Sequence, residues 1–133
     1  MNFREFFDRV VRPDYEEAMR QPLTLRSAYH AVSSLNTATE HLALDRLAYA
    51  VNVDLETLNR EVAKIRKDYP TLAAINSEAI KMKHVRRLTD KEPFSASKSS
   101  TSYSISDPTP PELVKVIHEG FETFKTFPEF TQK

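Results

Sequence analysis

The chain has 133 residues, enough for one domain with a buried core, and it contains one glycine and no cysteine. The missing cysteines exclude disulfide scaffolds, cysteine-based zinc sites and thiol catalysis, and the near absence of glycine argues against a strand-rich fold and a glycine-rich phosphate loop. Basic and acidic residues balance at 19 each, and this zero net charge disfavours a general nucleic-acid binder, whose affinity rests on neutralising phosphates.

The N-terminal segment predicts two short helices. Phenylalanine and valine recur at steps of three and four residues from Asn2 to Val11, which indicates one amphipathic helix. Pro13 is expected to interrupt it. Asp14 is expected to cap a second short helix, which Pro22 ends because the residue before proline avoids the α region.

The longest predicted helix begins near Thr24 and runs to about Leu44. Small residues occupy several of its faces, so other helices can approach closely, and we expect it to be the central helix of a bundle. Asp45–Val53 is a break of uncertain form. Asp54 then predicts the N-cap of a third helix, which Pro70 ends.

A fourth helix is expected from Pro70 or Thr71 to near Asp90. After it the composition changes, because Lys91–Pro108 is rich in serine, and this segment predicts a surface loop or a short hairpin. The last helix starts with a capping box from Thr109 to Glu112.

The apolar stripe of the last helix runs from Leu113 to Phe124, and Gly120 interrupts it. Phe127 and Phe130 predict that the tail docks back onto the body. Together these patterns predict a single all-α domain over residues 1–133, an up-and-down bundle of four to five helices with the serine-rich excursion at 91–108 before the last helix.

Positive charge is concentrated in residues 60–91, where nine Lys and Arg stand against four Asp and Glu, a net charge of +5. The dense end of this block is a candidate site for an anion or RNA phosphate: Lys81, Lys83, His84, Arg86 and Arg87. His84 is also the one weak catalytic candidate, since histidine exchanges protons near neutral pH. The alternative is structural, because cations are stabilised at a helix C-terminus by the helix dipole.

A second candidate is a ligand pocket between helices, lined by Tyr29, His30 and Glu40. The alternative is a core tyrosine beside a hydrogen-bonded histidine. The four histidines lack the spacing of a helical zinc site and no Glu-x-x-His motif occurs, so we expect no metal and no cofactor.

The central helix, RSAYHAVSSLNTATEHLA, paired with the later NSEAIKMKH, resembles the HEPN superfamily of small helical proteins and uncharacterised bacterial and phage helical proteins. The pattern reads Tyr69-Pro70, Ile75, Ala79 and Lys83-His84, over roughly residues 14–90. Catalytic HEPN ribonucleases have an arginine, then four to six other residues, and then the histidine. Ser77, Glu78 and Ala79 stand there instead, so the resemblance implies the fold without the nuclease site.

The leading functional hypothesis is a non-enzymatic interaction or accessory protein of bacterial or phage origin. A divergent HEPN-like protein that binds or cleaves RNA and a bundle that binds a small ligand are the alternatives. The resemblance also implies a homodimer. No apolar run approaches the roughly 18 residues of a membrane span and no secretory leader is evident, so a soluble cytoplasmic protein is expected.

Overall fold

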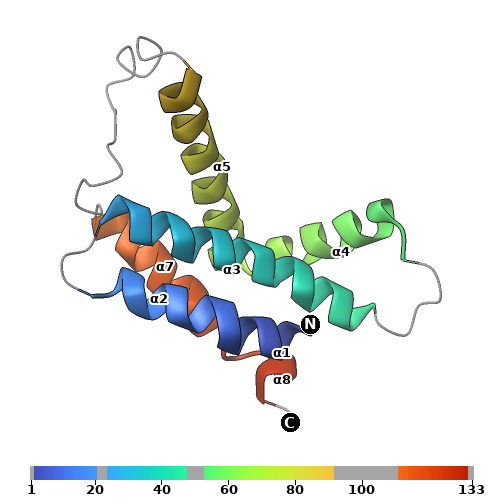
Figure 1. The fold of residues 1–133 in the computed structure, drawn as a ribbon. Coiled ribbons are helices and arrows are strands. Elements are labelled where there is room, and N and C mark those ends of the chain that lie inside the picture. The colour runs from blue at the N-terminus through green and yellow to red at the C-terminus, as the bar shows by residue number, and fades with distance from the viewer. Residues whose placement is uncertain (1, 21–23, 48–52, 92–110, 132–133) are drawn as a thin grey trace.

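The computed structural model describes residues 2–20, 24–47, 53–91 and 111–131, with side chains up to residue 82 in the third range. Within these ranges the regular structure is helical and no strand occurs, which confirms the all-α prediction. Figure 1 shows α3 (Leu25–Arg46) in the middle, with the N-terminal helices along one side and α5 (Pro70–Lys91) running across it. The predictions for the serine-rich segment beyond Lys91 and for the cap at Thr109 lie outside the described residues.

The N-terminal segment is one continuous helical stretch: α1 (Phe3–Phe6), η1 (Phe7–Val11) and α2 (Arg12–Ala18). The prediction that Pro13 interrupts the helix is therefore wrong. In η1 the turns widen, and the N–H of Arg12 bonds the carbonyl of Phe7, five residues back. Pro13 stands in the first turn of α2, directly after the widened turn of η1, which is a position where a helix tolerates proline.

Asp14 does not cap α2, because α2 continues directly from η1 and no side chain caps its start. Its carboxylate instead accepts a hydrogen bond from the hydroxyl of Ser34, a buried residue of α3. The bond ties α2 to the central helix and satisfies a hydroxyl that burial would otherwise leave without a partner.

Helix α3 is the centre of the bundle, as predicted. The hydroxyl of Thr24 caps it by accepting a bond from the N–H of Ser27 at 3.3 Å, and the helix continues to Arg46, past the predicted end near Leu44. Most of its buried residues are small. The buried residues are Ala28, Ala31, Val32, Ser34, Leu35, Ala38, Thr39, Leu42 and Ala43. This composition lets α2, α4, α5 and α7 all pack against one helix.

Two helices follow the central one. Asp54 caps α4 (Leu55–Asp68) as predicted, accepting a bond from the N–H of Thr57 at 2.7 Å. Tyr69 breaks the helical path and α5 begins at Pro70. Figure 1 shows α4 diverging from α3 toward its own N-terminal end, and α5 leaving the body in its second half.

Helix α7 (Pro111–Phe124) returns along α3 and α5, and the short α8 (Pro128–Thr131) ends the described chain. Gly120 marks the closest approach, because a Cβ built there would stand 2.9 Å from Cγ1 of Ile75 in α5. The missing side chain of Gly120 thus lets α7 pack closely on α5. Phe127 is buried and Phe130 is half-buried against the core, which confirms that the tail docks back.

Candidate functional site

The predicted basic helix end is the C-terminal part of α5, and this helix continues to Lys91. Lys81 is exposed, and its ammonium pairs with the carboxylate of Glu78 on the same helix at 3.4 Å. The side chains of Lys83, His84, Arg86 and Arg87 lie outside the described part of the chain. Anion binding at this end stays a prediction.

The predicted ligand pocket is spread along α3. Tyr29 is half-buried and His30 is exposed, with their ring centroids 6.3 Å apart. Glu40 is exposed and stands 11 residues after Tyr29, about 16 Å along the helix axis. The structure therefore brings Tyr29 and His30 together but not Glu40, and the pocket stays a prediction.

Glu40 instead lies near a cation of α4. The guanidinium of Arg66 donates to the side-chain oxygen of Asn36 at 3.0 Å. Burial lowers the pKa of Arg66, and the charge of Glu40 acts in the opposite direction. These contacts hold the C-terminal half of α4 on α3.

The structure also assembles a polar pair that sequence reasoning missed. The hydroxyl of Tyr15 in α2 lies 2.7 Å from Nδ1 of His118 in α7. Burial, reinforced by the carboxylate of Glu122, raises the pKa of Tyr15, so the phenol keeps its proton to higher pH than a free tyrosine does. The two residues are 103 positions apart, and nothing in the sequence signals the pairing.

Tyr15 ends a row of four aromatic side chains in contact, here called the aromatic strip: Phe130, Phe7, Phe121 and Tyr15. Consecutive ring centroids along it are 4.9, 5.0 and 3.8 Å apart. The strip joins the N-terminal helices to α7 and α8, because each ring comes from an element different from that of the next. Such pairs add stabilisation beyond the area that they bury.

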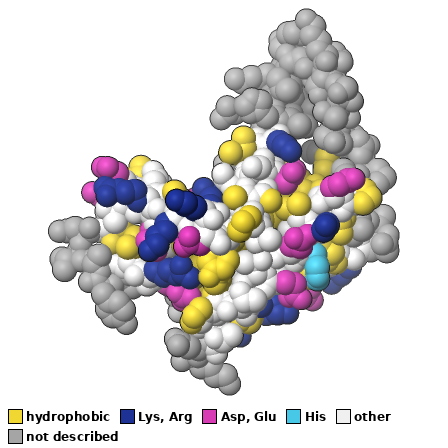
Figure 2. All heavy atoms as spheres, turned by 180° about the vertical axis from the view of Figure 1, so that it is seen from behind, with side chains coloured by type: hydrophobic (Ala, Val, Ile, Leu, Met, Phe, Trp, Pro, Cys, Tyr) yellow, Lys and Arg dark blue, Asp and Glu magenta, His cyan; other side chains and the backbone are white. Residues whose placement is uncertain are grey.

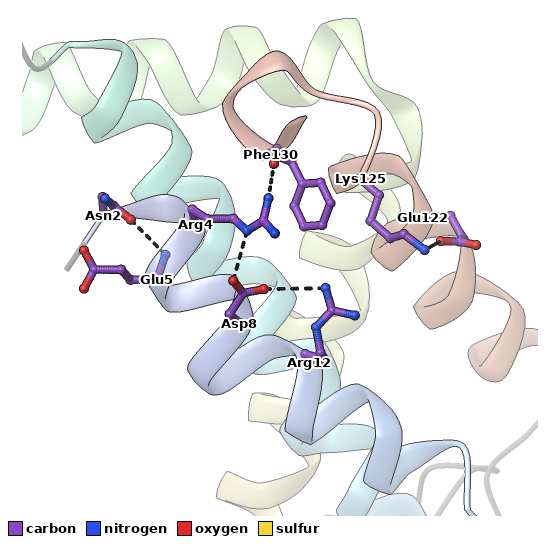
Figure 3. Close-up of polar contacts among 8 residues, drawn as sticks. All are labelled: Asn2, Arg4, Glu5, Asp8, Arg12, Glu122, Lys125 and Phe130. Atoms are coloured by element: carbon purple, nitrogen blue, oxygen red, sulfur yellow. Dashed lines mark hydrogen bonds and ion pairs between the residues drawn. The ribbon is translucent and has the colours of Figure 1, made fainter. Parts of the chain in front are cut away.

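Cations cover the aromatic strip. The guanidinium of Arg4 lies 4.2 Å from the ring centroid of Phe130 and also donates to the Phe130 carbonyl. Arg12 lies 5.5 Å from the Phe7 ring, and both arginines pair with Asp8 (Figure 3).

At the other edge, Lys125 lies 5.5 Å from the Phe121 ring and pairs with Glu122 at 2.9 Å. On this side of the molecule the aromatic side chains and the charges that flank them already have partners within the chain, so we read the strip as a structural element.

Helix α4 presents the opposite situation. Its apolar stripe runs through Ile65, Val62, Leu58 and Leu55, and exposure rises along it. Ile65 and Val62 are 1% and 5% exposed, Leu58 is half-buried, and Leu55 is 72% exposed. The stripe therefore runs off the body of the bundle toward the N-terminal end of α4.

A hollow of about 520 Å³, open to solvent, lies along this end of α4. We call it the α4 hollow, and α4 contributes to its lining Leu55, Glu56, Asn59, Arg60 and Ala63. Figure 2 shows Lys and Arg side chains over the part of the molecule that α4 forms, with hydrophobic side chains among them.

In the described part of the chain, His, Asp and Glu side chains do not form a group of three that could hold a metal ion. No helix within the described ranges combines the length and the apolar character that crossing a bilayer requires.

Comparison of the chain with protein-family models, with curated proteins and with solved structures finds no match. The resemblance to the HEPN superfamily therefore stays a prediction, as do the bacterial or phage origin and the cytoplasmic location.

Proposed function

We propose that this protein is a non-enzymatic interaction module that binds a protein partner through the N-terminal half of α4. The exposure of Leu55 supports this most directly. A leucine on the core-facing stripe of an amphipathic helix normally packs against the body, and burying it is worth about 1.5–3 kcal/mol. Here that stabilisation is not realised within the described chain.

The surroundings of Leu55 suit a protein surface better than a small ligand. The α4 hollow is open to solvent along α4, whereas small-molecule sites are enclosed and bury most of their ligand. Glu56 and Arg60 beside it are highly exposed and pair with each other at 3.1 Å, which is typical of the polar rim of an interface.

A photo-crosslinking residue at position 55 tests the proposal in the cells that make the protein. We expect Leu55→p-benzoylphenylalanine to give a discrete cross-linked species under illumination. The matched control is the same substitution at Lys64, an exposed residue of α4 turned half a revolution from Leu55. Equal cross-linking at the two positions, or none at position 55, would contradict the proposal.

A second candidate is binding of RNA or another phosphate-bearing anion at the end of α5. It is supported by the continuation of α5 through Lys91, which places the cationic segment in a helix that leaves the body in Figure 1. Replacing Lys83, Arg86 and Arg87 together with alanine should then abolish binding of a single-stranded RNA oligonucleotide in a filter-binding assay. Wild-type protein that retains no RNA at low salt would rule the candidate out.

A further inference from the structure

The residues that line the α4 hollow form a footprint centred on Asn59. Relative to Asn59 they are at positions −4, −3, 0, +1 and +4, which share one face of an α-helix. Leu55, Asn59 and Ala63 make one row of side chains at four-residue steps. When two helices cross, such rows fit between each other, and this set is the usual contact surface of a crossing.

The footprint is also complementary to itself. Leu55 is the large residue at one end of the row and Ala63 is the small residue at the other, with Asn59 midway. Suppose that a second copy of α4 crosses the first in the opposite direction, with a two-fold axis at Asn59. Each Leu55 then faces Ala63 of the other copy. A large side chain then meets a small one twice, as close packing of two helices requires.

Charge selects the direction of the crossing. In a parallel pair the partner's Glu56 would stand opposite Glu56, and likewise for Arg60, so like charges would meet. In the antiparallel pair Glu56 lies about 3 Å along the axis from the partner's Arg60, within reach of its long side chain. Because both side chains are highly exposed in the single chain, they can form this second ion pair without leaving buried partners behind.

We propose that the partner bound by α4 is a second copy of this chain, in an antiparallel α4–α4 crossing with its two-fold axis at Asn59. This rests on the proposed function, since it names the occupant of the same surface. A helix of 14 residues is about 21 Å long, so one crossing buries an area at the small end of specific interfaces. The dimer therefore forms at roughly 10–500 μM protein, in the range of transient complexes.

Sedimentation of the purified full chain between about 10 μM and 1 mM tests the dimer, a range set by its expected affinity. We expect Leu55→Ala to weaken association by about tenfold or more, because a symmetric dimer loses each contact twice. The matched control is Ile80→Ala, which truncates another exposed aliphatic side chain, 54% exposed, on α5, and which should leave association unchanged. Glu56→Arg or Arg60→Glu alone should each weaken it, and the double exchange should restore it.

Cross-linking tests the geometry, and the chain has no cysteine to interfere. Asn59→Cys should form a disulfide-linked dimer under mild oxidation much faster than the control Lys64→Cys, because only position 59 meets its symmetry mate. A monomer at 1 mM, association that Leu55→Ala leaves unchanged, or equal oxidation at positions 59 and 64 would overturn the inference. If the photo-cross-link from position 55 then joins a different protein, the interaction module stands without self-association. If position 55 gives no cross-link and the chain is a monomer, both the interaction module and the self-association are ruled out.

Discussion

The N-terminal helices, which contribute Phe7 and Tyr15 to the aromatic strip, and α4 start from the same sequence pattern and reach opposite outcomes. Both have an apolar stripe flanked by charged residues. Along the strip, Phe7 is fully buried between aromatic neighbours, whereas on α4 the stripe ends in the 72% exposed Leu55. The comparison shows that periodicity identifies the apolar face of a helix, while burial depends on which other elements lie against that face.

The largest effect should come from removing a ring of the strip. Phe7→Ala deletes a fully buried side chain that contacts Phe3, Phe121 and Phe130, and we expect it to lower the free energy of unfolding by about 3–5 kcal/mol. Urea denaturation followed by circular dichroism measures this. A loss below about 1 kcal/mol would show that the strip is not part of the cooperative core.

A smaller loss is expected where α5 and α7 approach most closely. Gly120→Val forces a branched side chain against Ile75 and should cost about 1–3 kcal/mol. Gly120→Ala is the matched control, because its gain of about 1 kcal/mol in helix propensity opposes its smaller clash. Thermal unfolding of both variants compares them, and equal melting temperatures would contradict the close approach.

The Tyr15–His118 pair should make a still smaller, pH-dependent contribution. Tyr15→Phe removes one hydrogen bond and should cost about 0.5–1.5 kcal/mol at neutral pH. The pKa of Tyr15 is raised on folding, so the folded state holds the proton more tightly. That stabilisation is present below the unfolded tyrosine pKa, near 10, and is lost as pH rises through the folded value.

Urea midpoints measured between pH 7 and pH 11 test the direction of the Tyr15 shift. The wild type should lose more stability over this range than Tyr15→Phe does. If the two lose stability in parallel, the phenol contributes nothing through its titration.

The smallest effect is expected on α4. Leu55→Lys replaces a side chain that is already exposed, so the free energy of unfolding should change by no more than about 0.5 kcal/mol at protein concentrations too low for association. Denaturation at about 1 μM measures the isolated chain, below the range expected for a transient dimer. A loss as large as that of Phe7→Ala would mean that Leu55 belongs to the core and that α4 has no open face.

Local sequence signals were enough to predict most of the fold. Asp54 was recognisable as an N-cap because a carboxylate before an amphipathic run can accept the free N–H groups of the first turn. Pro13 was misjudged because the widened turn of η1, which directly precedes α2, has no known sequence signature here. The site was harder still, since Tyr15 meets His118 only through the packing of α2 on α7.

The exposure of Leu55 illustrates the same limit. In the sequence it is one more member of a regular stripe, equivalent to Val62. Only the divergence of α4 from α3 separates the two residues, and that divergence depends on how the other helices share the surface of α3.

The bond from Arg4 to the carbonyl of Phe130 joins residues 126 positions apart, and it has a consequence for the order of folding. During synthesis α1, η1 and α2 are made first, but the rings and carbonyls that they pack against in α7 and α8 are made last. Helix α3 can cover part of their apolar face early, but the part that α7 and α8 cover must wait until those helices have been translated. Long-range closure of this kind slows folding and leaves nascent chains prone to aggregation.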